Sequence, residues 1–252
     1  WPFRQYETAR GIRKSSLHDR LLGWGACFGE AIGWERPNWY APKGIEPRYK
    51  YSYGRQNWFK YSAVEHQAVR ERVGLIDQSS FGKLLVSGPD AEAVLNNICA
   101  NDIAMSADRV VYTQWLNERG GIEADVTVTR ITEDKFLVVT GVECQVRDLN
   151  WLNRNIPADS RASVTDVTSA YAVLGVMGPQ SRDLLSRVTS AELSNEAFPF
   201  ATSREIDLGY TRARATRITY VGELGWELYV PVEFAVGVFD ALTEHGQDFG
   251  LS

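Results

Sequence analysis

Three acidic residues that lie near glycines are the side chains in this sequence best suited to chemistry. Glu123 and Asp125 belong to the stretch NERGGIEADVTVTR at residues 117–130, and Glu227 belongs to YVGELGWELYVP at residues 220–231. A carboxylate can act as a base beside a reacting nitrogen, or it can accept two parallel hydrogen bonds from a planar heterocycle. The neighbouring glycines permit sharp turns and a close approach of a ligand to the backbone.

The strand that carries Glu123 and Asp125 alternates between apolar and polar residues. Both acids fall on its polar face, because side chains along a strand alternate with a period of two. Periodicity therefore offers two acids and no reason to choose between them. The same alternation is typical of an antiparallel strand whose polar face meets solvent, in which case neither acid has a function. Tyr112 and Asn117 on the preceding strand offer polar contacts across the hairpin.

The second candidate strand alternates Glu227 and Tyr229 with apolar residues. A carboxylate buried there would need hydrogen-bond partners. A planar heterocycle with an amino group beside a ring N–H would supply two parallel donors. The alternative interpretation is structural, with Glu223 and Glu227 capping a turn and pairing with nearby arginines. The residues alone leave both interpretations open.

The composition excludes several classes of protein. The chain has 252 residues, of which 44% are hydrophobic and 23% charged, which is the profile of a soluble globular protein with one large domain or two small ones. Its net charge of -5 and its lack of a Lys/Arg-rich run argue against nucleic acid as a partner. No apolar run is long enough to cross a bilayer, so we expect no membrane partner either.

Cysteines and histidines are few and scattered. Three cysteines without a CxxC motif predict neither a disulfide framework nor a zinc site, and three separated histidines argue against a metal site or a Ser/His/Asp triad. The chain contains no GxGxxG and no GK[ST] motif, so we expect no flavin, nicotinamide or phosphate-cradling site of those types within it.

An internal repeat in the sequence indicates a duplicated structural unit. LLVSGPDAEAVLNNI and LGVMGPQSRDLLSRV contain the pairs Gly88-Pro89 and Gly178-Pro179, which are 178 − 88 = 90 residues apart. Each pair lies between an expected strand and an expected amphipathic helix, and a hairpin follows each helix. This pattern predicts an α+β fold with antiparallel sheets and helices, built from pseudo-duplicated strand–Gly-Pro–helix–hairpin units. Asp125 and Glu227 each lie early in a returning strand, so pseudo-twofold symmetry would bring them to a shared crevice.

Local patterns predict further elements. A Ser62–Glu65 capping box predicts a helix that extends to about Arg72. Apolar periodicity predicts helices over 144–155 and 232–246, and apolar runs predict strands over 83–86 and 136–139. In the N-terminal part we expect a short helix that includes Leu21, Leu22, Ala26 and Phe28, followed by irregular chain over 33–42 with aromatic anchors.

Several long stretches together resemble a known family. LNERGGIEADVTVTR (116–130), VMGPQSRDLL (176–185) and YVGELGWELYVP (220–231) resemble the folate-binding half of the dimethylglycine and sarcosine dehydrogenases. That half is similar to the aminomethyltransferase, or T-protein, of the glycine cleavage system. FGEAIGWERPNWYAP (28–42) and YSYGRQNWF (51–59) resemble the join between the flavin-bearing and folate-binding regions. The resemblance covers nearly the whole chain and implies a T-protein-like folate-binding fold.

The resemblance also implies roles for individual residues. The family's aspartate near folate N10 matches Asp125 and not Glu123, so we expect Asp125 to be the catalytic residue. The family's pterin-binding glutamate matches Glu227, and Tyr112 matches the hairpin that lines the folate pocket. Glu223 and Asn117 complete the expected cofactor-binding set. Burial of Asp125 would raise its pKa and make it a stronger base.

The implied activity is one-carbon transfer. Flavin-bearing family members oxidise an N-methyl amine to an iminium, and the folate part captures the one-carbon unit on tetrahydrofolate to give 5,10-methylenetetrahydrofolate. We therefore expect tetrahydrofolate as the cofactor and an iminium or N-methyl amine-derived one-carbon unit as the partner. FAD is expected only in a flavin dehydrogenase region of the same polypeptide, which this chain does not contain.

The resemblance divides the chain into two parts. Residues 1–50 are expected to be the tail or connector of a preceding flavin-dependent dehydrogenase region, and residues 51–252 the folate-binding domain, truncated at its C-terminus. A start at Trp1 without an initiator Met fits a fragment. The expected location is the cytoplasm for a bacterial protein and the mitochondrial matrix for a eukaryotic one.

Two other functions remain as alternatives. One is a non-catalytic regulatory protein of the same architecture, similar to the regulatory subunit of pyruvate dehydrogenase phosphatase. The presence of both Asp125 and Glu227 argues against it, because a scaffold has no physical need for either acid. The other is a folate-dependent methyltransferase that demethylates a sulfonium or a betaine. The dehydrogenase-type join at residues 24–59 argues against that function.

Overall fold

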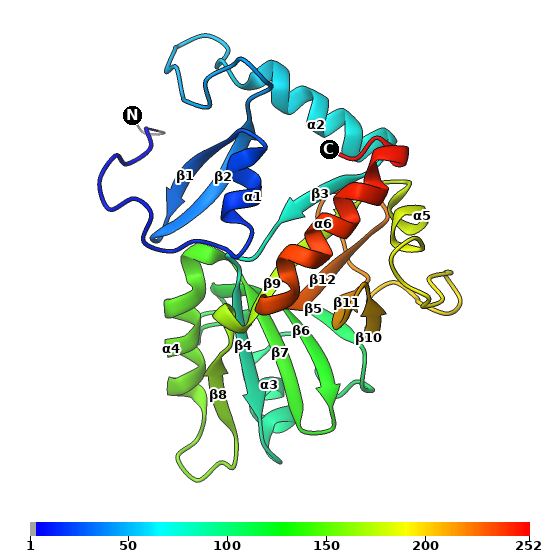
Figure 1. Ribbon diagram of the computed structural model, residues 1–252. Helices are drawn as coiled ribbons and strands as arrows, with labels where there is room; N and C mark the ends of the chain where they lie inside the picture. Colours follow the sequence, from blue (N-terminus) through cyan, green and yellow to red (C-terminus); the bar gives the residue numbers. More distant parts are fainter. Residues whose placement is uncertain (1–3) are drawn as a thin grey trace.

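The computed structural model describes residues 4–252, so the expectation about Trp1 lies outside the described residues. Two five-stranded antiparallel sheets form the body of the molecule, and a two-stranded hairpin lies beside them (Figure 1). The strand order is β5-β6-β7-β4-β8 in one sheet, which we call sheet I, and β10-β11-β12-β9-β3 in the other, which we call sheet II. The predicted fold class, α+β with antiparallel sheets, is confirmed.

The elements follow the chain in three groups. The N-terminal part comprises α1 (His18–Gly23), β1 (Ala26–Ala31), β2 (Trp34–Tyr40) and α2 (Phe59–Glu71). Sheet I and its helices comprise β4 (Gly82–Ser87), α3 (Ala91–Ile98), β5 (Val110–Leu116), β6 (Ile122–Thr132), β7 (Lys135–Thr140), α4 (Gln145–Asn155) and β8 (Ser163–Asp166). Sheet II and its helices comprise β3 (Gly74–Asp77), β9 (Tyr171–Met177), α5 (Ser181–Leu185), β10 (Ser203–Leu208), β11 (Thr211–Thr216), β12 (Gly225–Pro231) and α6 (Ala235–Gly246). Short 3-10 turns are η1 (Val142–Cys144), η2 (Thr168–Ala170), η3 (Val232–Phe234) and η4 (Gln247–Phe249).

The glycines of the two Gly-Pro pairs have the same conformation and the same kind of neighbour. Gly88 has φ +128° and Gly178 has φ +135°, a region that side-chain-bearing residues rarely adopt. A Cβ atom would lie 1.9 Å from the Arg161 carbonyl oxygen at the first position and 2.4 Å from the Arg72 carbonyl oxygen at the second. Glycine is therefore required twice, at equivalent places of a duplicated unit.

The duplication pairs the strands differently from the sequence-based prediction. Sheet I places β7 beside β4, and sheet II places β12 beside β9, so β12 corresponds to β7 and β11 corresponds to β6. The Gly88 amide donates to Asp134 just before β7, and the Gly178 amide donates to Leu224 just before β12. Asp125 lies on β6 and Glu227 on β12, so the expectation that they occupy equivalent strands is wrong. The sequence repeat did not predict this correspondence, because a match between two hairpins in the sequence does not define which of their strands pairs with β4 or β9.

Each sheet buries one face against helices. The core of sheet I packs on α3 and α4 through residues such as Leu84, Val126 and Val138. The core of sheet II packs on α1, α5 and α6 through residues such as Leu174 and Trp226. In Figure 1, α6 crosses sheet II at β9 and β12, α4 runs beside β8 and β4 on the left, and α3 lies toward the bottom. The faces that helices leave uncovered belong to alternate residues of the same strands.

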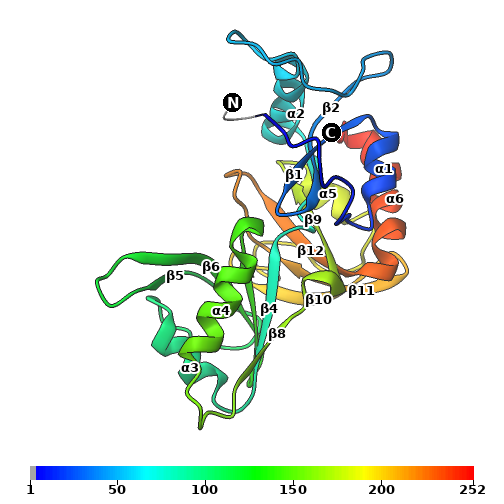
Figure 2. The same ribbon diagram turned by 90° about the vertical axis from the view of Figure 1, so that its left-hand side faces the viewer.

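Those remaining faces meet each other. Leu137 and Val139 of β7 pack against Val173 of β9 and Tyr229 of β12, which joins the two sheets through a small cluster. Figure 2 shows the two sheets in succession along the molecule, with β4 and β9 near their junction. We call this the inter-sheet layer, and the strand alternation directs Asp125 and Glu227 toward it.

The N-terminal part corrects two predictions. The short helix ends at Gly23, so Ala26 and Phe28 lie on β1 and not in a helix. Residues 33–42 were expected to be irregular, but they form most of β2, which pairs with β1. The aromatic Trp39 of β2 is buried in a cluster with Cys27. The sequence analysis did not predict this strand because it follows Gly33 and contains Pro37, and both residue types are uncommon in strand interiors.

Helix α2 begins earlier than its expected capping box. Its first residue is Phe59, and Ser62 is a buried residue inside the helix without a capping hydrogen bond. The predicted helices 144–155 and 232–246 and the predicted strands 83–86 and 136–139 are confirmed within one to three residues. Within residues 4–252, no helix is both long and apolar enough to cross a membrane.

Candidate functional site

Glu227 is a buried carboxylate in the inter-sheet layer. It lies on β12 between Thr216 of β11 and Gly175 of β9, and only 3% of its surface is exposed. Its hydrogen bond within the described residues comes from the Tyr229 hydroxyl, which donates to Oε2 at 2.6 Å. Burial raises the pKa of Glu227, while the Tyr229 hydroxyl and the positive charge of Lys83 oppose that shift. Its environment differs from the structural alternative, which expected an arginine partner.

Gly175, which pairs with Glu227, lets the Gln78 side chain approach the backbone beside this carboxylate. It faces the inter-sheet layer, and a Cβ atom there would lie 2.8 Å from Oε1 of Gln78. Gln78 Oε1 and Ser80 Oγ are both buried, and neither has a hydrogen-bond partner among the residues that the structure describes. Unpaired buried polar atoms are uncommon in folded proteins and call for a partner. Glu227 and the neighbouring Gln78 Oε1 are therefore acceptors that a donor-rich ligand would satisfy.

Asp125 lies near the start of β6, which runs between β5 and β7 in sheet I. It is exposed, as in the alternative interpretation of a strand whose polar face meets solvent. Its Oδ1 atom accepts a 3.0 Å hydrogen bond from Nε2 of Gln114, the residue opposite it on β5. Tyr112 stands on the same strand as Gln114, and hydrogen bonding to Asp125 is the main cause that raises the pKa of its hydroxyl. Asp125 is thus a solvent-accessible carboxylate with a fixed orientation.

The Tyr220 hydroxyl is within reach of the charges of both acids. Its pKa is raised to about 12, first by desolvation of the hydroxyl and then by the negative charges of Glu227 and Asp125, with Tyr112 contributing as well. Desolvation of the hydroxyl is the largest cause of this shift, and the two negative charges add to it. Since both carboxylates act on one hydroxyl, sheets I and II bring Asp125 and Glu227 to the same region. Sequence reasoning missed Tyr220, although it opens the quoted motif YVGELGWELYVP.

The remaining two predicted site residues have structural partners. Glu223 forms a 2.7 Å ion pair with Arg70 of α2, as the structural interpretation expected for this residue. Asn117 holds the β5–β6 turn: its Oδ1 atom accepts hydrogen bonds from the amides of Arg119 and Gly121. Its Nδ2 atom donates to Glu123 at 2.8 Å. Among the described residues, neither Glu223 nor Asn117 forms a hydrogen bond or an ion pair with Asp125 or Glu227.

The contact of Glu123 separates it from Asp125. Periodicity placed both acids on one face and offered no choice between them. Glu123 is engaged by Asn117 at the turn, whereas Asp125 lies one pleat further into the sheet beside Gln114 and Tyr112. Of the two acids, Asp125 is the one whose charge reaches Tyr220, the tyrosine that Glu227 also affects.

Lys83 is a buried cation in the same layer that sequence reasoning missed. It lies on β4, it is fully buried, and its ammonium donates to the Ser79 carbonyl oxygen at 2.8 Å. Desolvation lowers its pKa to about 8, against the favourable charges of Asp77, Asp166 and Glu227. Only its place within an apolar strand, GKLLVS, could have drawn attention to it.

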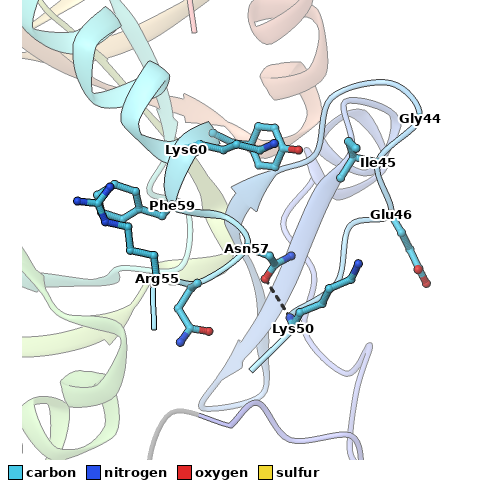
Figure 3. A pocket seen from close by; sticks show the side chains of 10 residues that line it. Gly44, Ile45, Glu46, Lys50, Arg55, Asn57, Phe59 and Lys60 are labelled. Carbon is cyan, nitrogen blue, oxygen red and sulfur yellow. Dashed lines mark hydrogen bonds between the residues drawn. The ribbon is translucent and has the colours of Figure 1, made fainter. Parts of the chain in front are cut away.

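A separate cavity lies in the N-terminal part (Figure 3). It has a volume of 590 Å³ and is lined by residues of the segment 44–61. The guanidinium of Arg55 lies 4.7 Å from the centre of the Phe59 ring, and the ammonium of Lys60 lies 4.8 Å from the Tyr61 ring. The cavity contains none of the predicted site residues, so we do not assign the site to it. Among residues 4–252, no group of three or more His, Cys, Asp or Glu side chains is arranged to hold a metal ion.

The fold defines a class of protein. The crystal structure of the glycine cleavage system aminomethyltransferase T from Bartonella henselae matches with a TM-score of 0.77 at 24% identity, over 96% of this chain and 59% of that one. This likeness concerns the fold, which is that of the aminomethyltransferase T-proteins. The family described as the GCVT N-terminal domain matches residues 17–252, so the chain belongs to that family.

Curated relatives extend the comparison. The 4-methylaminobutanoate oxidase (formaldehyde-forming) of Paenarthrobacter nicotinovorans is 48% identical over 251 residues. The mitochondrial dimethylglycine dehydrogenase of Rattus norvegicus is 33% identical over 255 residues, and the mitochondrial pyruvate dehydrogenase phosphatase regulatory subunit of Mus musculus is 32% identical over 256 residues. These matches cover 99–100% of this chain and 29–30% of each relative. The chain thus spans about three tenths of the length of these relatives, and the resemblance inferred from the motifs is confirmed.

Proposed function

We propose that this chain is the tetrahydrofolate-dependent one-carbon transfer part of an N-methyl amine demethylating dehydrogenase, and that it forms 5,10-methylenetetrahydrofolate. The observation that carries the proposal is the environment of Glu227. A carboxylate that is 3% exposed, with one hydrogen bond from Tyr229, stands beside Gly175 and the unpaired Gln78 Oε1. A buried acceptor set of this kind fits the adjacent N–H and amino donors of a pterin ring.

Glu227 is assigned to binding. Its carboxylate accepts two parallel hydrogen bonds from the heterocycle, which a neutral amide cannot do. Tyr112 and Tyr220 border the region between Glu227 and Asp125 and are assigned to the walls of the folate pocket. For Glu223 and Asn117, the ion pair with Arg70 and the turn hydrogen bonds favour a structural role over a binding role.

Asp125 is assigned to catalysis. Bound tetrahydrofolate would supply the nucleophilic amine nitrogens that accept the one-carbon unit. The Asp125 carboxylate, held by Gln114, can accept a proton released at such a nitrogen or stabilise the cation that develops there. Its exposure in this structure leaves it accessible to a ligand. A closed pocket over the two acids would also keep water from an electrophilic one-carbon unit.

The flavin chemistry is assigned to a separate region of the same polypeptide. The named relatives are about three times as long as the part that this chain matches. We propose residues 1–50 as the connector from that region and residues 51–252 as the folate-binding domain. The name of the 48% identical relative describes a formaldehyde-forming oxidase of a methylated amino acid. It supports a methylated amine as the substrate of the whole protein.

The alternative function is regulatory. Identity alone does not separate the alternatives, because the regulatory subunit and the dimethylglycine dehydrogenase match almost equally well. The buried Glu227 favours the folate function, because a buried carboxylate with a raised pKa destabilises a fold that has no use for it. A folate-dependent demethylating methyltransferase would use the same two acids and is distinguished by its methyl donor.

Calorimetric titration with tetrahydrofolate tests this proposal. Glu227→Gln should weaken binding by at least about tenfold, since a charge-assisted hydrogen bond is lost. Asp125→Asn should leave binding within about threefold of the wild type and should slow the formation of 5,10-methylenetetrahydrofolate from formaldehyde by roughly 100-fold. Glu205→Gln and Asp207→Asn, at exposed positions of the edge strand β10, are the matched controls. A protein that does not bind tetrahydrofolate, or variants that equal the wild type, would refute the assignment.

A further inference from the structure

Lys83 and Glu227 face the inter-sheet layer from opposite sheets. Lys83 comes from β4 of sheet I and Glu227 from β12 of sheet II, and both are buried. Isolated charges are unfavourable in such a layer unless an opposite charge or hydrogen bonds compensate them. Lys83 takes no part in the one-carbon chemistry described above, so its burial needs a separate explanation.

A chain of contacts leads from Lys83 toward Glu227. The Lys83 ammonium donates to the Ser79 carbonyl oxygen, and the Ser79 hydroxyl accepts a 3.1 Å hydrogen bond from the Val173 amide. Val173 lies on β9, where it pairs with Tyr229 of β12. Tyr229 in turn donates its hydroxyl proton to Glu227. The segment that holds the ammonium is therefore fastened to the strand beside Glu227.

The ammonium keeps unused hydrogen-bonding capacity. It has three N–H donors, and within the described residues its hydrogen bond to Ser79 is the one that the structure shows. The charged groups whose fields reach Lys83 come from four elements: Asp77 of β3, Asp166 at the end of β8, Glu227 of β12 and Arg13 before α1. Those that reach Glu227 are Lys83 and the Tyr229 hydroxyl. Lys83 is thus the cation that acts on Glu227 across the layer.

We propose that Lys83 is a positioning residue for Glu227, whose positive charge, held by Ser79 on the opposite sheet, keeps Glu227 in its carboxylate form. Lys83 acts through Glu227 and does not need to touch a ligand. Its significance for folate binding rests on the proposed function, because only an ionised Glu227 accepts two hydrogen bonds at once. The electrostatic coupling of the two side chains is independent of any ligand.

The first experiment measures that coupling without folate. The chain contains six lysines, so ¹³C-lysine labelling and NMR can follow the titration of each one. In Glu227→Gln the midpoint of Lys83 should fall by about one pH unit, because a nearby negative charge stabilises the ammonium. Glu205→Gln is the control and should leave Lys83 unchanged. An unchanged Lys83 midpoint in Glu227→Gln overturns the proposal.

The second experiment tests whether the coupling between Lys83 and Glu227 affects tetrahydrofolate binding. Lys83→Met preserves the length of the side chain and removes its charge. It should weaken tetrahydrofolate binding at pH 7 by roughly tenfold in the wild-type background and by less than twofold in the Glu227→Gln background. Equal losses in both backgrounds would mean that Lys83 acts through packing, which contradicts the proposal. If Lys83→Met does not fold, the NMR titration alone decides.

The two experiments separate this inference from the proposed function. A Lys83 midpoint that responds to Glu227→Gln in a protein that binds no tetrahydrofolate would support the Lys83–Glu227 coupling and refute the folate assignment. Folate binding that depends on Glu227, together with an unresponsive Lys83, would support the folate assignment and refute the role of Lys83.

Discussion

The Tyr229 hydroxyl donates a 2.6 Å hydrogen bond to Oε2 of Glu227, two residues earlier on the same strand. Both side chains point into the inter-sheet layer, and both are buried. Burial raises the pKa of each group, but the hydrogen bond lowers the pKa of Glu227 while the carboxylate further raises that of Tyr229. The Tyr229 hydroxyl is therefore the donor of the pair, and both oxygens of Glu227 keep acceptor capacity, because each carboxylate oxygen has two lone pairs.

Tyr229→Phe should weaken tetrahydrofolate binding by roughly tenfold at pH 7, because it removes a hydrogen bond to the charged form of Glu227. Loss of this bond raises the pKa of Glu227, so affinity should recover as the pH is raised. Calorimetry at pH 6, 7 and 8 measures both effects. Tyr210→Phe, at a fully exposed position, is the control. Equal affinities of Tyr229→Phe and wild type at every pH would contradict this prediction.

Glu227→Gln should stabilise the fold at neutral pH by about 1 kcal/mol, because it removes a buried charge that the proposed ligand needs but that is unfavourable for folding. The pKa of Glu227 is raised in the folded protein, so the folded state holds the proton more tightly than the unfolded one. That contribution is complete below the ordinary pKa of about 4.5 and is lost as the pH rises through the folded pKa. Urea unfolding should therefore show that the advantage of the variant grows from pH 5 to pH 8. A stability difference between the variant and the wild type that stays constant or decreases from pH 5 to pH 8 would contradict this prediction.

The duplicated unit was predictable because its signal is local. Gly88 and Gly178 are each followed by proline and a helix, and the backbone at both positions requires glycine. The helices and central strands followed from apolar periodicity for the same reason. The correspondence of β12 with β7 was not predictable from the sequence repeat, because strand order depends on pairing between distant segments.

The candidate site was predictable only in part. The family resemblance supplied Asp125 and Glu227, but nothing local indicated that Glu227 is buried and Asp125 exposed. Gln78, directly after β3, and Lys83 on β4 were not predicted, because a polar residue in or beside a strand is ordinary until the opposite sheet is known to cover it. Tyr220 gains its significance from charges that lie on two different sheets.

Gly178→Ala should destabilise the protein by roughly 2–4 kcal/mol. The residue has φ +135°, and a Cβ atom would lie 2.4 Å from the Arg72 carbonyl oxygen, so backbone strain and a steric clash add. Gly237→Ala is the matched control, because Gly237 lies inside α6 with open space around its Cβ position. This control should gain about 0.5–1 kcal/mol from helix propensity. Urea unfolding of both variants checks the contrast, which fails if the two changes have similar effects.

Lys83 should leave its own mark on the pH dependence of stability. Its pKa is about 8 in the folded protein, against 10.5 as the ordinary value, so the unfolded chain binds more protons between these pH values. Stability contributed by this residue therefore rises with pH across that window, since the burial of the ammonium is relieved as it loses its proton. Between pH 8 and pH 10 the free energy of unfolding of the wild type should rise by about 2 kcal/mol relative to Lys83→Met. Tyrosines that ionise near pH 10 affect both proteins equally, so the difference between them isolates Lys83. Urea denaturation at half-unit steps of pH measures this difference, and a flat difference would mean that Lys83 titrates as an ordinary exposed lysine.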